Sequence, residues 1–481
     1  MPTTNRPNIL LITSDQQRYD TLGVSGNALI HTPNLDNLAS QGINFQRAYV
    51  NNPVCIASRA CIQTGRYTHQ HGVEYMEDAV DETPGLPPWE MTFMERLQAT
   101  GYHTAAFGKL HMLPPKGFDE MALSGGQGAR WTQLFGSPLG PAPLGNAYAQ
   151  WLEARRPGAF AALHEQRRTP EYKEHGTAVT SVIPFADYVD TWVAENTVDF
   201  LRRQRAAERP FFAWCGFLNP HGPLDAPEPY DRMYDPQAIP LPATYLADVT
   251  DRPAFYAERQ RAFRNQPTGD KLRRMLAFYY GLCTMLDDLC GRLFTTLQET
   301  GLWDNTLIIY TSDHGDMLGD FGMTGKSNFM EPTIHVPLLL KPPHSANLES
   351  FEPGRRSSDL IELIDIAPTI LDYAGVPIPD TMQGVALRPL LADSAAGKSQ
   401  ILCEYMSNDR SIKGKCLRTA QYKYVFWTPG REEELYDLQS DPQERHNVVG
   451  DASYREIRNE MRTRLIEQLL SSERALHAWG A

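Results

Sequence analysis

The alternation of short apolar runs with helical patterns is the feature that most constrains how this chain folds. Segments with helical periodicity lie at 33–42, 190–204 and 271–300. The apolar runs that separate them have the length and composition of buried strands, and they occupy residues 8–13, 104–111, 210–218, 306–315 and 336–341. Strands that alternate with helices predict an α/β fold with a mostly parallel sheet covered by helices on both faces.

Polar residues follow several of these apolar runs directly. They are Ser14-Asp15 after the first run, Asn219-Pro220-His221 after the run at 210–218, and Ser312-Asp313-His314 near the end of the run at 306–315. Ligands of open α/β sheets bind beyond the carboxyl ends of the strands. The three clusters are therefore predicted to converge on one site.

Charge and composition narrow the class of function. The chain has 45 Lys and Arg against 58 Asp and Glu, a net charge of -13, which argues against a surface built to hold nucleic acid or anionic lipid. An anionic substrate must instead be captured by a local basic pocket. The first residues carry no pattern typical of a leader peptide, and no apolar stretch approaches the roughly 20 residues of a membrane span. Seven cysteines without a paired pattern fit a reducing compartment, so we expect a soluble cytoplasmic protein.

Near Ser394 the alternation of apolar runs and helical patterns gives way to short β-like runs. We predict a large catalytic domain at 1–393 and a smaller α+β subdomain at 394–481, where short β-like runs precede a terminal helix. Two segments rich in Pro, Gly and charge, at 125–145 and 225–270, are predicted to be long loops that cross the active-site face.

The most informative motif surrounds a cysteine. Residues 53–66 read Pro-Val-Cys-Ile-Ala-Ser-Arg-Ala-Cys-Ile-Gln-Thr-Gly-Arg. The segment resembles the signature of the type I sulfatases of the alkaline phosphatase superfamily, Cys-x-Pro-Ser-Arg followed by Thr-Gly, with Ala57 where Pro is usual. The resemblance implies that a maturation enzyme oxidises Cys55 to formylglycine (3-oxoalanine). A lone cysteine before a helix is more often structural, but the surrounding motif reverses that expectation.

The chemistry of sulfate esters explains the need for such a group. Their oxygens repel a nucleophile and their leaving alkoxide is basic, so the site requires a strong nucleophile, charge neutralisation and a proton donor. An aldehyde hydrate has two hydroxyls on one carbon: one attacks sulfur, and deprotonation of the other then expels sulfate. If a helix begins after Pro53, Cys55 lies at its positive end and Arg59 one turn later, where it can hold the hydrate.

Two further pairs match metal positions of the family. Asp15-Gln16 and Asp313-His314, with the group at position 55, imply one divalent ion, for which oxygen ligands favour Ca²⁺ and an imidazole ligand makes Mn²⁺ the second choice. Sulfatases often carry Asp-Asp and Asp-Asn at these positions. Gln16 and His314 are instead similar to the phosphonate monoester hydrolases of the same superfamily.

Four cationic or titratable residues complete the predicted site. The resemblance implies that Lys109 and Lys326 bind the sulfate oxygens, that His111 is the base toward the second hydroxyl, and that His221 with Lys326 is the acid toward the leaving oxygen. An unperturbed imidazole, with a pKa near 6.5, could serve in either role at neutral pH. Lys109 and His111 favour the sulfatase branch over the phosphonate hydrolases.

The resemblance implies the alkaline-phosphatase-like α/β/α sandwich with a smaller C-terminal α+β subdomain. The first hypothesis is a sulfuric ester hydrolase that acts on an aryl sulfate or a small sulfated metabolite or sugar. The second is a phosphonate monoester or phosphate diester hydrolase with the same nucleophile, and the third is a binding or structural protein that kept only the scaffold. Expected partners are the small sulfate ester, the formylglycine-generating enzyme and further copies of the chain in a dimer or tetramer.

Overall fold

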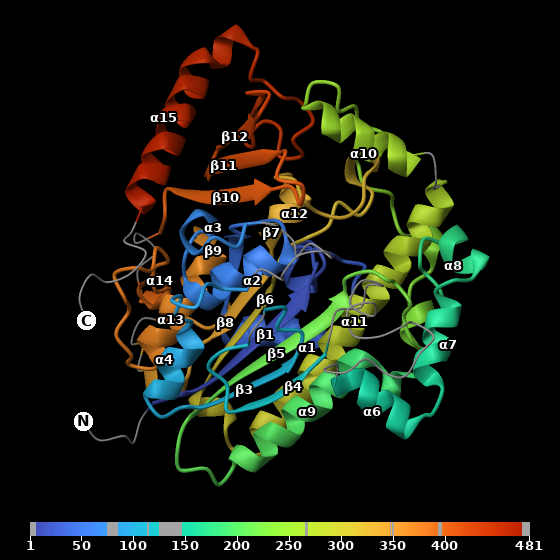
Figure 1. The fold of residues 1–481 in the computed structure, drawn as a ribbon, viewed down its shortest axis with the longest axis vertical. Helices are drawn as coiled ribbons and strands as arrows, with labels where there is room; N and C mark the ends of the chain where they lie inside the picture. The colour runs from blue at the N-terminus through green and yellow to red at the C-terminus, as the bar shows by residue number, and fades with distance from the viewer. Residues whose placement is uncertain are drawn as a thin grey trace.

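A large mixed sheet organises the computed structural model, which describes residues 6–74, 85–112, 115–124, 147–264, 268–346, 348, 351–392 and 397–473 (Figure 1). The strand order in the described part is β4-β3-β5-β1-β6-β8-β2-β7, with β9 paired to β2. Strands β4, β3, β5, β1 and β6 pair in parallel, and β8 runs antiparallel to β6 and β2. The strands are β1 (Asn8–Asp15), β2 (Ile43–Tyr49), β3 (His103–Gly108), β4 (Glu120–Leu123), β5 (Phe211–Pro220), β6 (Thr306–Ser312), β7 (His335–Val336), β8 (Leu338–Lys341) and β9 (Arg355–Glu362).

The central strand β1 is buried along its whole length, as an apolar run in a parallel sheet predicts. Because successive side chains of a strand point to opposite faces, Leu10 and Ile12 join the core on one face, while Ile9 and Leu11 join the core on the other. The predicted α/β sheet with two covered faces is thus confirmed.

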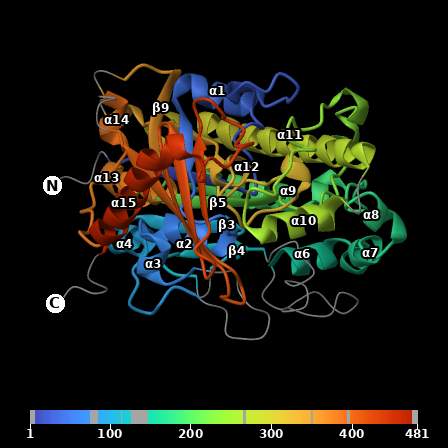
Figure 2. The ribbon, with the colours of Figure 1, turned by 90° about the horizontal axis from the view of Figure 1, so that it is seen from above.

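Helices α1 (Pro33–Gln41), α9 (Val189–Gln204) and α11 (Gly269–Glu299) pack in the first core, and α2 (Cys55–Thr64), α4 (Phe93–Ala99) and α13 (Ile366–Tyr373) in the second. Figure 2 shows α1 and α11 on one side of the sheet and α2 and α4 on the other. The remaining α-helices are α3 (Thr68–His71), α6 (Ala147–Arg155), α7 (Ala159–Gln166), α8 (Pro170–Glu174), α10 (Ala254–Arg264), α12 (Glu331–Ile334), α14 (Arg388–Ala392) and α15 (Arg455–Ser472). Among the described helices, none is both long and apolar enough to cross a membrane.

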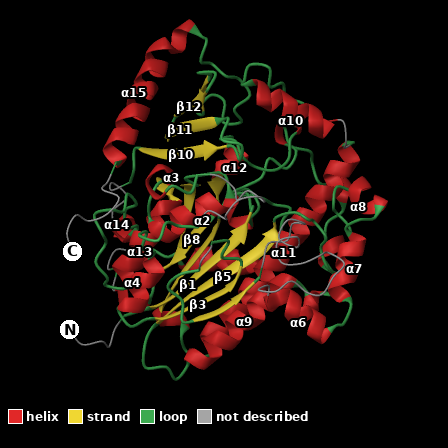
Figure 3. Ribbon diagram, in the orientation of Figure 1, coloured by secondary structure: helices red, strands yellow, loops and turns green. Residues whose placement is uncertain are grey.

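A second, antiparallel sheet lies above the first (Figure 3). Its order is β10-β11-β12-β13, and α15 packs on it through a core that includes Leu417, Tyr424 and Leu465. The predicted smaller α+β unit is therefore present. The strands are β10 (Gln400–Met406), β11 (Lys413–Thr419), β12 (Tyr422–Thr428) and β13 (Glu433–Asp437). The predicted boundary between residues 393 and 394 lies outside the described residues and stays a prediction.

One local expectation needs correction. The segment 225–270 is not only loop, because it contains α10, whose Phe255 stacks on Tyr256 and meets Trp427 edge-on. Contacts with distant segments decided a structure that the local pattern left ambiguous. The predicted β-like run at 416–427 forms β11 and β12. The predicted loop at 125–145 lies outside the described residues.

Candidate active site

The three polar clusters converge at the carboxyl edge of the sheet, as predicted. Strand β1 lies between β5 and β6, so that Asp15 is opposite Pro220 on one side and Ser14 is opposite Ser312 on the other. Cys55 comes to the same place from α2, and Lys326 from the loop that follows β6. Segments far apart in sequence thus build one site, in which each cluster follows directly from a buried strand.

A pair of glycines allows Lys109 to reach this site. The Lys109 backbone N–H donates to the Gly216 carbonyl at 2.7 Å, where β3 and β5 end side by side. A Cβ atom on Gly108 would lie 2.1 Å from the Gly216 oxygen, and one on Gly216 would lie 2.3 Å from the Lys109 oxygen. Gly108 also has a φ of 85°, which side chains disfavour. Glycine at both positions therefore permits the close approach of the two chains.

Cys55 is the first residue of α2 and is only 1% exposed. The Lys326 ammonium donates to its Sγ at 2.9 Å. Burial raises the pKa of the Cys55 thiol, but Lys326, Lys109 and His111 outweigh it and hold this pKa well below its ordinary value. If Cys55 is oxidised as predicted, its Sγ stands in for a hydroxyl oxygen of the hydrate. The surroundings therefore favour negative charge at that atom, which is what a nucleophile of this kind needs.

Arg59 bridges the two carboxylates at the centre of the site. Its guanidinium donates to Asp313 Oδ2 at 2.7 Å, to Asp15 Oδ2 at 3.2 Å and to the Lys109 carbonyl at 2.7 Å. All three side chains of the Arg59–Asp15–Asp313 set are fully buried. The predicted role of Arg59 in holding the hydrate stays a prediction. In this structure the Arg59 guanidinium contacts the carboxylates of Asp15 and Asp313.

Two lysines add positive charge around the same point. Lys109 pairs with Asp15 Oδ2 at 2.5 Å, and Lys326 approaches the His314 Nε2 at 2.8 Å. Burial raises the pKa of Asp15, but the cations around it, Lys109 foremost, hold this pKa well below its usual range. The site is thus rich in positive charge and holds an ionised Asp15, an arrangement suited to bind an anion beside a metal ion.

His221 is neutral in this structure. Burial lowers its pKa to about 3, and the positive charges of Lys326 and Lys109 act in the same direction, while Asp15 opposes them. Its Nδ1 donates to the Gly222 carbonyl at 2.5 Å. The assumption of an unperturbed imidazole was therefore wrong for His221, because burial cannot be read from a loop sequence. An acid role for His221 requires the added negative charge of a bound substrate.

The residues fit a divalent ion. Ligand atoms of Cys55, Asp313 and His314 lie within 4.8 Å of one another. Among the described residues, Asp15 Oδ1 is a buried oxygen without a hydrogen-bond partner, and it lies 3.8 Å from His314 Nε2. His314 Nδ1 donates to the Gly315 carbonyl at 2.9 Å, which leaves Nε2 as the ring atom with a lone pair. The Gln16 backbone N–H donates to Asp313 Oδ1 at 3.1 Å, so Gln16 lies next to this set; its predicted role as a ligand stays a prediction.

Two residues that the sequence did not single out support this site. Asp316 accepts a hydrogen bond from the Gln16 side chain, and Arg259 of α10 donates to the carbonyls of Thr324, Lys326 and Ser327, in the loop that carries Lys326. Asp316 is three residues after Asp313, so proximity in sequence could have identified it. Arg259 gave no such signal, because its segment was predicted to be loop.

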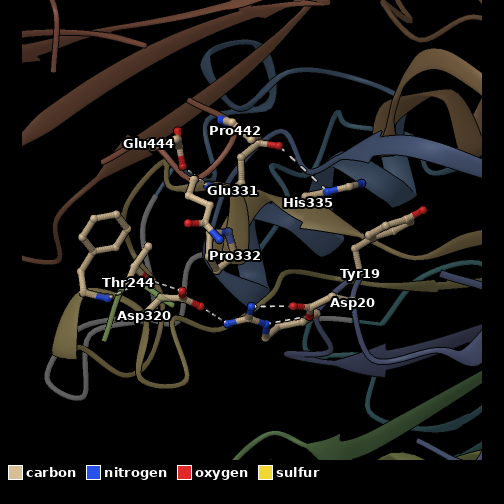
Figure 4. Close-up of a pocket in the computed structure, with 12 residues that line it drawn as sticks. Tyr19, Asp20, Thr244, Asp320, Glu331, Pro332, His335, Pro442 and Glu444 are labelled. Carbon is tan, nitrogen blue, oxygen red and sulfur yellow. Dashed lines mark hydrogen bonds and ion pairs between the residues drawn. The ribbon is translucent and has the colours of Figure 1, made fainter. Parts of the chain in front are cut away.

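A separate cavity of about 220 Å³ lies nearby (Figure 4). Its described lining includes Asp20, Asp320, Glu331 and Glu444, but none of the predicted catalytic residues. Arg18 ties Asp20 to Asp320 there, at 2.7 and 2.6 Å. These acids are paired with cations within the protein, so the cavity is distinct from the candidate active site.

The carboxyl edge of this sheet brings together a cysteine at a helix terminus, several cations and a set of residues that fits a hard metal ion. This arrangement is typical of a hydrolase for anionic esters. The sulfatase family profile matches residues 7–376, and the profile of the N-sulphoglucosamine sulphohydrolase C-terminal region matches residues 319–471. The chain therefore belongs to the sulfatase family, within the alkaline phosphatase superfamily, and is a sulfuric ester hydrolase.

Relatives of known name cover nearly the whole chain. An arylsulfatase of Clostridium perfringens is 32% identical and aligns over 97% of this chain and 95% of its own length. The multifunctional alkaline phosphatase superfamily protein PehA of Trinickia caryophylli is 28% identical, over 93% of this chain and 92% of its own. Among solved structures, the phosphonate monoester hydrolase of Agrobacterium radiobacter superposes with a TM-score of 0.76 at 26% identity, covering 97% of this chain and 96% of that one.

Proposed function

We propose that this sulfatase cleaves an aryl sulfate, or a small sulfated metabolite or sugar, with a formylglycine hydrate made from Cys55 and one divalent ion. The observation that carries the proposal is the position of Cys55: at the start of α2, 2.9 Å from the Lys326 ammonium and beside Asp313 and His314. The similarity to the C. perfringens arylsulfatase supports the substrate class.

Asp15, Gln16, Asp313 and His314, with the group at position 55, would hold the ion. When bound, a divalent ion supplies positive charge that polarises the nucleophile and the sulfate oxygens. Hard oxygen donors dominate this set, which favours Ca²⁺, while the His314 nitrogen keeps Mn²⁺ as the second choice.

Four residues of the chain would neutralise the sulfate and transfer the protons. Lys109 and Lys326 neutralise the sulfate oxygens, where fixed charge is worth most as charge develops in the transition state. His111, which hydrogen bonds to Cys55, would take the proton of the hydrate's second hydroxyl. Lys326 keeps its proton, because Cys55, Asp15 and Asp313 outweigh the effect of burial and raise its pKa, so it can stabilise the leaving oxygen together with His221.

The test uses purified protein and a chromogenic aryl sulfate. Mass spectrometry of the Cys55 peptide should show the aldehyde or its hydrate, and Cys55→Ala should lose nearly all sulfate release. Cys61→Ala is the matched control, since Cys61 lies on the same helix and is equally buried, but contacts His71 at 3.3 Å rather than the site. An unmodified thiol in active enzyme, or full activity of Cys55→Ala, refutes the proposal and would leave another nucleophile. A persistent thiol in a protein without activity would instead favour the non-catalytic scaffold.

A second candidate function has its own support. Gln16 and His314 resemble the phosphonate monoester hydrolases, and one such enzyme superposes at 26% identity. Under this alternative the same nucleophile would cleave a phosphonate monoester or a phosphate diester. Catalytic efficiencies on a sulfate and a phosphonate with the same leaving group separate the two, because the physiological class should be favoured by the larger kcat/KM.

A further inference from the structure

Asp316 makes three hydrogen bonds that join two parts of the candidate site. Its Oδ2 accepts from the Gln16 side-chain nitrogen. Its Oδ1 accepts from the backbone N–H groups of Leu318, at 2.6 Å, and Gly325, at 3.0 Å. The side chain is therefore anchored by the loop on one oxygen and presents the other to Gln16. Asp316 is only 5% exposed, so water does not compete strongly for these contacts.

Hydrogen-bonding chemistry determines which end of the Gln16 carboxamide contacts Asp316. A carboxylate only accepts hydrogen bonds, whereas a carboxamide has a donor end and an acceptor end. Asp316 must therefore take the nitrogen of Gln16, and the carboxamide oxygen is turned away from it. The backbone of Gln16 is fixed as well, because its N–H donates to Asp313 Oδ1 at 3.1 Å and its carbonyl accepts from the Tyr279 hydroxyl at 2.5 Å.

Only one end of a carboxamide is a metal ligand. The oxygen binds hard cations, while the nitrogen, whose lone pair is delocalised, does not. A glutamine in a ligand set thus needs a neighbour that decides which end faces the ion. The carboxylates of Asp15 and Asp313 cannot do so alone, because they too would attract the donor end.

We propose that Asp316 is a positioning residue that turns the oxygen of Gln16 toward the ion and anchors the turn before Lys326. The inference rests on the proposed metal site. The anchoring acts through Gly325, which has a φ of 76° and directly precedes Lys326. One side chain thereby links the orientation of a metal ligand to the position of the lysine that contacts Cys55.

Asp316→Asn is the decisive variant. Asparagine keeps one oxygen for the Leu318 and Gly325 amides, so its nitrogen must face Gln16. Two amide nitrogens cannot pair, and the Gln16 carboxamide turns over, which brings its nitrogen toward the ion. We expect the affinity for Mn²⁺ or Ca²⁺ to fall about 10- to 100-fold, measured by isothermal titration of chelator-treated full-length protein.

The double variant Gln16→Glu with Asp316→Asn tests the orientation itself. A carboxylate at position 16 accepts from the amide nitrogen introduced at position 316 with one oxygen and leaves the other for the ion, so metal affinity should return to at least the wild-type level. Asp320→Asn is the matched control, because Asp320 lies on the same loop but contacts Thr244 and Arg18 instead of Gln16 (Figure 4). Its metal affinity should be unchanged.

Each outcome decides between the two proposals. Wild-type affinity in Asp316→Asn, or no recovery in the double variant, overturns the positioning role while the metal site stands. A wild-type protein that binds neither ion overturns the metal site and this inference together. The melting temperature of each metal-free variant shows whether the fold is retained, because Asp316→Asn keeps both backbone contacts.

Discussion

Replacing Arg59 by Met should destabilise the metal-free protein strongly. Methionine fills a similar volume but carries no charge, so the loss is chiefly electrostatic. In the variant Asp15 retains its ion pair with Lys109 at 2.5 Å. Asp313 keeps the backbone N–H of Gln16 at 3.1 Å, but loses the guanidinium at 2.7 Å. One fully buried carboxylate thus loses the cation that contacts it directly.

The magnitude follows from that burial. Removing one partner of a fully buried ion pair costs about 3–5 kcal/mol, because the remaining charge stays desolvated. For a chain of this length the melting temperature should fall by about 3–5 °C. A divalent ion that binds between Asp15 and Asp313 restores positive charge there, so added ion should recover much of the loss; an ion at 100 times its Kd stabilises by about 2.7 kcal/mol.

Differential scanning calorimetry of chelator-treated protein, repeated with increasing Ca²⁺ or Mn²⁺, measures both effects. Arg66→Met is the matched control, because Arg66 forms a buried pair with Glu90 at 2.9 Å that includes no predicted metal ligand. This variant should also melt early, and because its metal site is intact the ion should raise its melting temperature only as much as that of the wild type; its deficit relative to the wild type should therefore persist, whereas that of Arg59→Met should shrink. An Arg59→Met protein that melts with the wild type in the absence of metal would refute the reasoning, as would an equal response of both variants to the ion.

Three further predictions test other parts of the site and fold. Lys326→Met removes the cation 2.9 Å from the Cys55 Sγ and should lower kcat on an aryl sulfate about 10²- to 10³-fold; a change confined to KM would contradict this. Gly216→Ala places a Cβ 2.3 Å from the Lys109 oxygen and should cost about 1–3 kcal/mol and lower kcat/KM; wild-type values of both would contradict it. Burial lowers the pKa of His71 to about 3, so the unfolded chain binds more protons than the folded protein between pH 6.5 and 3. The free energy of unfolding therefore decreases as the pH is lowered through that window, by at most about 1.4 kcal/mol per pH unit. His71→Gln should flatten the dependence of melting temperature on pH there, and parallel curves would contradict it.

The sequence predicted the position of the site because local rules determined it. Buried parallel strands read as continuous apolar runs, and polar residues directly after them must lie at one edge of the sheet. Asp15, His221 and Asp313 were placed together on this basis alone. The motif around Cys55 added the helix terminus that faces the same edge, and Cys55 is indeed the first residue of α2.

What the sequence could not supply depends on contacts between distant segments. Arg259 reaches the Lys326 loop from α10, whose Phe255 packs on Trp427 of β12, and its local sequence read as loop. The neutral state of His221 follows from burial, which a Pro- and Gly-rich segment does not indicate. The hydrogen bond from the Gln16 side chain to Asp316 joins residues 300 positions apart. Such contacts have no periodicity that a sequence pattern could report.

Charge alone cannot decide between the two candidate substrates. A sulfate monoester and a phosphonate monoester each carry one negative charge, so Lys109 and Lys326 neutralise either equally well. The esters differ in the number of terminal oxygens, since the sulfate has three and the phosphonate has two and a carbon substituent. A site that surrounds position 55 with Lys109, His111 and Lys326 offers donors for all three oxygens, and a carbon placed against one of them would leave a desolvated donor unpaired. The ratio of kcat/KM on matched esters therefore measures how many of these donors contact the transferred group.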